Sequence, residues 1–335
     1  MSQQPHAGGA REPQLSVILP TCDNYSTIRL TVRALSRQTI RDRIELVIVA
    51  PVDDPGVNED EVAAFGKVTI VNGGPLRTSN ISRSAGIRAA SAPIVVLSED
   101  HSFPEPDWAE ALLKAHESGC AVAGPVIRNS NPKSLTSWAN LLLEYGPWLD
   151  GAPRGEASDL PGHNSAYNRD VLLAYGDRLE SVLEVEAVVQ KDLIENGHHM
   201  LLEPRAVTSH LNFSRLRSSL GLRFNAGRSF AGYRTTGWPA RKRLLYIAGG
   251  ALIPFVRFAR IAGMLRRSPN YSWLFPRVLP SLCVMLVVDG VGEIAGYITG
   301  PGDSPRFLGE IEFNRVRFMN AADRAEYSEM VAALT

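Results

Sequence analysis

Cysteine is scarce in this 335-residue sequence, which holds only Cys22, Cys120 and Cys283. The three stand far apart and form no Cys-x-x-Cys pair, so a disulfide framework and a structural zinc site are both disfavoured. We therefore expect the protein to work in a reducing compartment. The opening residues MSQQPHAGGAREPQ also lack an apolar core, so we expect no signal peptide there and a disordered N-terminus over residues 1–13.

Acidic residues are absent from one long stretch, although the formal net charge of the whole sequence is zero. Residues 204–288 carry 14 Lys and Arg side chains and no Asp or Glu. Residues 1–203 carry 17 basic and 27 acidic side chains, and residues 289–335 carry 4 and 8. A solvated surface normally mixes both signs, so the basic stretch indicates an anionic partner: lipid headgroups, phosphates or nucleic acid.

Short apolar runs alternate with helical patterns in the first part of the chain. The runs predict strands at 15–20, 44–50, 67–71, 92–97 and 121–127, and the patterns predict helices at 27–38, 81–91 and 106–118. This alternation predicts an α/β fold, in which helices cover both faces of a mostly parallel sheet. Ligands of such sheets bind beyond the carboxyl ends of the strands.

Three side chains that bind metals follow the fourth of these runs. Glu99, Asp100 and His101 come directly after APIVVL and one further Ser. Carboxylate oxygens and imidazole nitrogens suit a divalent cation with mixed ligands. Such a cation, if it also held a diphosphate, would neutralise charge on a leaving group. An acidic loop without any ligand has the same appearance, so these residues alone leave both interpretations open.

Five motifs in order resemble the family 2 glycosyltransferases, which open with SVIIPTYN and carry the carboxylate motif LDDDDxPxPDWL. The motifs are LSVILPTCDN (15–24), SRSAGIRAA (82–90), LSEDHSFPEPDW (97–108), LPGHNSAYNRDVL (160–172) and LEVEAVVQKDLIENGHHMLLEPRAVTSH (183–210). The resemblance covers about the first two thirds of the chain. It implies the GT-A fold, a Rossmann-like nucleotide-diphospho-sugar transferase domain, and inverting transfer of a hexose.

The resemblance also implies roles for single residues. Glu186 matches the family's acidic general base, which takes the proton of the attacking acceptor hydroxyl. The acceptor would be contacted by His163, Asn164 and Glu184. The nucleotide sugar would be contacted by Pro20, Thr21, Asp23, Asp53, Arg83, Glu99 and Asp100. A divalent metal, Mn²⁺ or Mg²⁺, would be held by Glu99, Asp100, His101 and His210.

The sequence departs from the family pattern in three places. Ala50 and Pro51 stand where the family has the acids of VVDDGSTD, so Asp53 or Asp54 would have to replace them through a loop shift. Glu99 stands where the family has Asp. The QxxRW motif of processive synthases is absent from residues 210–245, and we therefore expect single additions in place of polymer extrusion.

The basic stretch contains two apolar runs, at 244–267 and 278–300. A spanning helix needs about 20 apolar residues. Pro254 and Arg257 interrupt the first run and two acids interrupt the second, so the runs either span the bilayer or lie in its interface. We expect association with anionic lipid at the cytoplasmic face and no nucleic-acid partner. Asp289 and Glu293 share a helix face and should face protein or pair with Arg.

These features divide the chain into parts. We predict a GT-A domain over residues 14–212, a helical membrane-associated region over 213–303 and a C-terminal tail over 304–335. The predicted activity is metal-dependent, inverting transfer to a hydroxyl of a lipid-linked glycan. Two alternatives stay open. One is a polyprenyl-phosphate glycosyltransferase, whose ionised acceptor needs no base. The other is a non-catalytic membrane-bound adaptor with the same fold.

Overall fold

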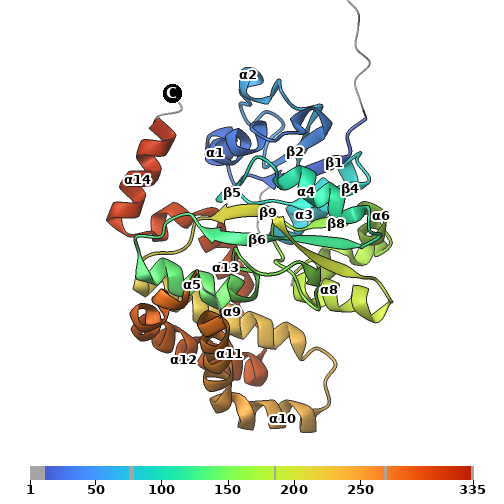
Figure 1. Ribbon diagram of the computed structural model, residues 1–335. Helices are drawn as coiled ribbons and strands as arrows, with labels where there is room; N and C mark the ends of the chain where they lie inside the picture. The colour runs from blue at the N-terminus through green and yellow to red at the C-terminus, as the bar shows by residue number, and fades with distance from the viewer. Residues whose placement is uncertain (1–11, 75–78, 185, 268–269, 333–335) are drawn as a thin grey trace, which may run out of the picture.

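A computed structural model describes residues 12–74, 79–184, 186–267 and 270–332, so most of the predicted disordered N-terminus lies outside the described residues. The chain forms a mixed sheet, with order β3-β2-β1-β4-β8-β6-β9-β5 and β7 paired to β9 (Figure 1). The strands are β1 (Leu15–Pro20), β2 (Ile44–Ala50), β3 (Lys67–Asn72), β4 (Ile94–Leu97), β5 (Ser102–Pro104), β6 (Val122–Asn129), β7 (Gly155–Glu156), β8 (Ala166–Asn168) and β9 (Met200–His210).

The sheet is parallel in its first half and mixed in its second. Strands β3, β2, β1 and β4 run parallel, as the sequence predicts. Strand β8 then pairs antiparallel with both β4 and β6, and β5 pairs antiparallel with β9. All five predicted strands form, with ends that differ by one or two residues in most cases. The predicted α/β architecture is confirmed, but the expectation of a mostly parallel sheet holds for the first half of the sheet alone.

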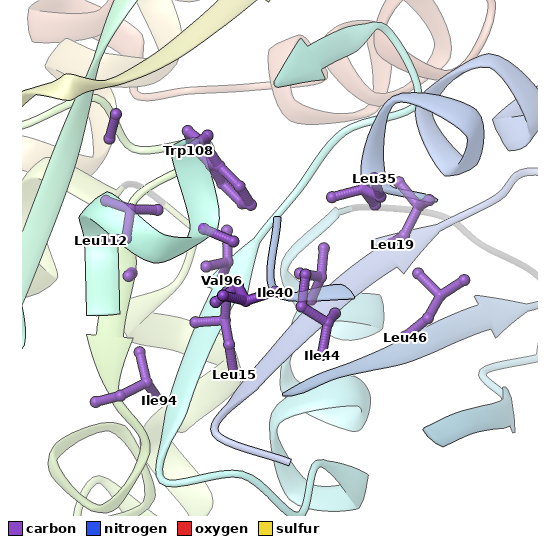
Figure 2. Close-up of a cluster of buried hydrophobic side chains, with 14 of the residues drawn as sticks. Leu15, Leu19, Leu35, Ile40, Ile44, Leu46, Ile94, Val96, Trp108 and Leu112 are labelled. Carbon is purple, nitrogen blue, oxygen red and sulfur yellow. The ribbon is translucent and has the colours of Figure 1, made fainter. Parts of the chain in front are cut away.

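Helices cover both faces of the sheet. They are α1 (Tyr25–Ser36), α2 (Glu59–Val62), α3 (Ser79–Ala89), α4 (Trp108–His116), α5 (Leu135–Tyr145), α6 (Arg169–Leu173), α7 (Leu179–Val182) and α8 (Glu186–Glu195). Side chains alternate along a strand, so Leu15 and Leu19 of β1 pack with Leu35 of α1 and Trp108 of α4 (Figure 2). The intervening Ile18 packs into the second core on the opposite face.

The remaining helices form a layer below the sheet in Figure 1, with α10 farthest from it. They are α9 (Leu216–Arg234), α10 (Ala240–Gly249), α11 (Ile253–Arg267) and α12 (Phe275–Thr299). Leu265 and Leu282 pack against Trp138 and Leu142 of α5. Two segments, 240–266 and 272–299, have the length and composition of membrane spans, and only 11% of the most apolar window of the first is buried.

The two acids of the second apolar segment are neutralised inside the protein. Asp289 is 3% exposed and Glu293 is 6% exposed. Arg257 of α11 pairs with Asp289, and its Nη1 lies 3.6 Å from Glu293 Oε1. The expectation that these acids face protein and pair with Arg is confirmed.

The last part of the chain returns to the GT-A domain. It forms α13 (Ser304–Phe313), a short 3₁₀ turn at Arg315–Phe318 and α14 (Ala321–Ala332). Asn131 Nδ2 donates a hydrogen bond of 2.7 Å to Asp323, and the Asn320 amide donates to Ser214 Oγ. The segment predicted as a tail is therefore helical and packed against the strand-bearing domain.

Helices α9 and α12 approach each other through glycine. A Cβ at Gly292 of α12 would lie 2.1 Å from the carbonyl oxygen of Phe224, and one at Gly296 would lie 2.3 Å from that of Arg228. Backbone atoms cannot yield as a flexible side chain can. The absence of side chains at these two positions therefore sets the distance between the helices.

We expect Gly292→Ala to lower the free energy of unfolding by about 1–3 kcal/mol, the usual range for overpacking a core. Gly249→Ala in α10 is the matched control, since a Cβ there meets nothing within 4 Å and Ala is the better helix former. Urea unfolding followed by tryptophan fluorescence measures both. Equal unfolding midpoints for the two variants would contradict close packing of α9 on α12.

Candidate active site

The candidate site lies where several strands end at one edge of the sheet. Strands β1 and β4 are parallel neighbours, so the residues that follow Pro20 and Leu97 emerge side by side. The chain turns after β4 and enters β5, where Ser102 pairs with His210 at the end of β9. This pairing brings His210 beside Glu99 and His101, which are far from it in the sequence.

Glu99, His101 and His210 form a compact group. One ligand atom of each lies within 4.8 Å of the others. His101 Nε2 is 3.5 Å from Glu99 Oε1, and His210 Nε2 is 3.7 Å from Glu99 Oε2. All three side chains are at most 5% exposed. Three of the four predicted metal ligands are thus brought together.

Neighbouring oxygens hold both imidazoles in place. Asp100 Oδ1 lies 2.6 Å from His101 Nδ1, and Asn212 Oδ1 lies 2.9 Å from His210 Nδ1. Supporting bonds of this kind orient the ligands of metal sites. Asp100, expected as a ligand, contacts His101 through Oδ1 in this structure. Glu99 Oε1 and His101 Nε2 are buried without a well-formed hydrogen bond, so the donor set fits a divalent cation of mixed oxygen and nitrogen preference.

The charges around Glu99 keep its carboxylate ionised. Burial opposes ionisation of Glu99, but His163 and His101 outweigh it and hold its pKa well below the usual range. Burial and Arg315 both oppose a proton on His101, yet the surrounding carboxylates prevail and raise its pKa to about 10. Burial and Arg315 lower the pKa of His210 to about 3. A cation bound by Glu99 would replace the proton on His101.

A second charged cluster adjoins the first. Arg83 of α3, 2% exposed, contacts both Glu186 at the start of α8 and His163. His163 Nδ1 lies 2.9 Å from Glu99 Oε1, and its Nε2 lies 3.8 Å from Glu186 Oε1. Burial raises the pKa of Glu186, but His163 and Arg83 outweigh burial and lower it. Gly162 permits this approach, since a Cβ there would lie 2.8 Å from that of Glu186.

Asn164 holds the carboxylate of Glu99 in place through a hydrogen bond. Its backbone has a φ of 64°, in the left-handed region that Asn tolerates better than most residues. Its Nδ2 donates to Ser102 Oγ at 3.0 Å and to Glu99 Oε2 at 3.3 Å. The side chain is 1% exposed. The acceptor contact expected of Asn164 stays a prediction.

The other predicted residues lie around this centre. Thr21 Oγ1 donates to the Asn24 carbonyl at 2.7 Å, and Asp23 accepts from the Asn24 amide at 2.6 Å. Asp53, in the loop after β2, accepts from Asn72 Nδ2 at 2.9 Å. Glu184 accepts from Tyr233 Oη of α9 at 3.1 Å. Because β1 and β2 are parallel neighbours, Asp23 and Asp53 follow strands that end at the same edge.

Two further functional candidates, Glu312 and Arg315, could not be predicted from the sequence because no motif contains them. Glu312 of α13 places Oε1 3.4 Å from His101 Nε2. Arg315 is 4% exposed, pairs with Glu312 at 2.6 Å and donates to the Leu211 carbonyl at 3.0 Å. The spacing of Glu312 and Arg315 is that of an ordinary surface ion pair on a helix. The pair becomes a functional candidate only because the chain returns to the sheet edge and places Glu312 beside His101.

Comparisons with known proteins agree with the family that the motifs resemble. Residues 16–176 match the family model described as Glycosyl transferase family 2. A Haloferax volcanii protein named Glucosyl-dolichyl phosphate glucuronosyltransferase is 26% identical over 181 residues, which cover 49% of this chain and 55% of that protein. A Sinorhizobium fredii protein named Uncharacterized protein y4gI is 24% identical over 33% of this chain and 13% of its own length. The chain thus spans about half the length of the first relative.

The fold has a counterpart among solved structures. The mannosyltransferase PcManGT from Pyrobaculum calidifontis, in complex with GDP-Man and Mn²⁺, matches with a TM-score of 0.52 at 15% identity, covering 84% of this chain and 87% of that chain. At this identity the likeness shows the fold alone, and it is the GT-A fold that the motifs imply. Residues 16–176 of this chain thus carry the sequence pattern of glycosyltransferase family 2.

Proposed function

We propose that this protein moves a hexose from a nucleotide-diphosphate donor to a hydroxyl of a lipid-linked glycan, with inversion, at the cytoplasmic face of a membrane. The observation that carries the proposal is the pair of adjoining clusters at the sheet edge. Glu99, His101 and His210 form the donor side. Glu186 lies beyond His163 on the acceptor side.

On the donor side, Glu99, His101 and His210 would hold Mn²⁺ or Mg²⁺, while Asp100 and Asn212 orient the two imidazoles. The metal, when bound, neutralises charge on the diphosphate leaving group. The nucleotide would lie over the ends of β1 and β2, where Pro20, Thr21, Asp23 and Asp53 are found. Arg83 is held in place by Glu186 and His163. It supplies a fixed positive charge beside the carboxylate of Glu99.

On the acceptor side, Glu186 would act as the general base. Its carboxylate is kept ionised by Arg83 and His163, which is the form that accepts a proton. An acceptor hydroxyl that gives its proton to Glu186 would attack the sugar carbon opposite the leaving diphosphate, which inverts the configuration. Preorganised charges on both sides of the sugar are the main source of rate enhancement in such a site.

The acceptor is proposed to be lipid-linked because the helical region has an apolar exterior. Large apolar side chains of α10, α11 and α12 are 46% to 71% exposed, and they are Leu244, Leu245, Phe255, Val256, Val284, Val287 and Val291. Arg241, Lys242 and Arg243 stand at the start of α10. Apolar side chains beside clustered cations suit an anionic bilayer surface. The relative named Glucosyl-dolichyl phosphate glucuronosyltransferase supports a lipid-carried acceptor.

Loss of the metal site should abolish donor binding. Calorimetric titration of UDP, GDP, dTDP and CDP with Mn²⁺ is expected to reveal one tight nucleotide for the wild-type protein. Glu99→Gln should weaken it by about 100-fold, on the scale seen when metal-site residues are removed. Glu195→Gln, a 62%-exposed acid of α8, is the control. A folded wild-type protein that binds none of the four nucleotides would refute the transferase and leave the adaptor.

Glu186→Gln should separate the two acceptor chemistries. The amide keeps the shape of the side chain but cannot take a proton, so transfer to a hydroxyl is expected to fall by about 100-fold or more. Nucleotide binding should persist at close to the wild-type affinity. Transfer is measured with radiolabelled donor and extracted lipid acceptors. Transfer to a polyprenyl phosphate that survives the substitution would support the rival enzyme, whose acceptor is already ionised.

Membrane association should depend on the apolar exterior. The double substitution Leu245→Ser/Phe255→Ser removes two side chains that are 68% and 71% exposed. Burial of each side chain in lipid contributes a free energy of about 1.5–3 kcal/mol. The partition of the variant to anionic vesicles should therefore fall at least tenfold in flotation assays. Ile70→Ser, at the β3 edge of the sheet and 43% exposed, should leave partition unchanged. Equal partition of all three proteins would sink the membrane proposal.

A further inference from the structure

A cleft of about 1080 Å³ lies between the GT-A domain and the C-terminal helices. Its walls come from the end of β1, from α3, from the α7 segment, from α9 and from residues 302–314. Asn80, on its α3 wall, precedes Arg83 by one helical turn, and Glu184, on another wall, precedes Glu186 by two residues. Two residues of the cleft wall are therefore close neighbours in sequence of Arg83 and of the proposed general base.

The cleft is strongly acidic. Among the described residues of its lining, Glu180, Glu184, Asp303 and Glu310 are acidic and Arg306 alone is basic. Carboxylates at this density repel a phosphate, because like charges at short range destabilise each other by kcal/mol amounts even near a protein surface. Ionised carboxylates accept hydrogen bonds and cannot donate them. A ligand that matches this lining is therefore not an anion and is rich in hydrogen-bond donors, as a polyhydroxylated sugar is.

A buried polar atom points to the same ligand. Asn80 is 8% exposed, and its Nδ2 donates to the Glu180 carbonyl at 3.0 Å. Its Oδ1 is buried and accepts no hydrogen bond within the described part of the chain. Buried acceptors are normally satisfied, so this oxygen calls for a donor from the cleft. Tyr233, which donates to Glu184, adds an aromatic wall against which the C–H face of a sugar ring packs.

We propose that this cleft is the acceptor subsite and that it selects an uncharged, polyhydroxylated sugar unit over a phosphate. The inference rests on the proposed function, and it decides between the two acceptor chemistries considered above. The C-terminal segment, through Asp303 and Glu310, is then part of the specificity-determining surface. The acidic lining keeps phosphate groups out while the sugar end of the acceptor enters.

Two probes with the same aryl group test this selection: p-nitrophenyl β-D-glucoside and p-nitrophenyl phosphate. Saturation-transfer NMR titrations use the full-length protein in a neutral detergent. The glucoside is expected to bind saturably and the phosphate at least tenfold more weakly. Glu184→Gln and Glu310→Gln should each weaken glucoside binding about tenfold, the loss of a charge-assisted hydrogen bond. Glu326→Gln, on α14 and 51% exposed, should leave glucoside binding unchanged.

Charge reversal supplies the converse test. Glu310→Lys should strengthen binding of the phosphate probe and weaken that of the glucoside. The proposal is overturned if the phosphate binds the wild-type protein as tightly as the glucoside. It is also overturned if the glucoside fails to bind up to its solubility, or binds equally to all the variants.

Metal-dependent nucleotide binding, measured on the same samples, separates this inference from the transferase proposal. Loss of probe selectivity with intact nucleotide binding would refute the acceptor subsite and leave a transferase. Absent nucleotide binding with selectivity intact would refute the transferase and leave a sugar-binding cleft.

Discussion

The ionised carboxylate of Glu99 is the constraint around which the site is built. It is 5% exposed, and a buried charge is stable only when it is paired and hydrogen-bonded. Its partners come from separate parts of the chain: His101 from the turn after β4, His210 from the end of β9, and His163 with Asn164 from the loop before β8. Each side chain reaches Glu99 because the register of the paired strands sets its position along the sheet. The sheet and the site therefore stabilise each other.

The first half of the sheet was predictable because its strands are buried on both faces. Strands β1, β2 and β4 are buried at every position, so each reads as a continuous apolar run whose limits are easy to see. Helix ends were less predictable. Helix α1 begins at Tyr25, two residues before the apolar pattern suggests, because Asn24 caps it by accepting from the Ser26 amide. A capping side chain overrides periodicity at the first turn.

The remaining parts of the site depend on contacts that leave no local pattern. Asn212 is two residues beyond the last motif, and its bond to His210 is set by the way the chain leaves β9. Glu312 and Arg315 are specified only by the packing of α13 on residues 211–213, where Arg315 also lies over the Phe213 ring at 4.4 Å. The backbone of Asn164 has a positive φ, which the residue type at that position of the motif does not reveal. The motifs contain Glu99, His101 and His210, which the fold brings together, whereas the groups that hold the two imidazoles could not be predicted without the fold.

The separation of charge along the chain now has a spatial counterpart. Cations without acids fill residues 204–288, and most of this stretch forms the helical layer below the sheet (Figure 1). Acids line the cleft to which α9 of this layer contributes Tyr233. In the proposed function, a lipid-linked acceptor carries a phosphate at its membrane end and sugars at the other. The basic layer attracts the phosphate and the acidic cleft repels it, so only the sugar end is directed towards Glu186. A protein with zero net charge would in this way orient its substrate by where each sign is placed.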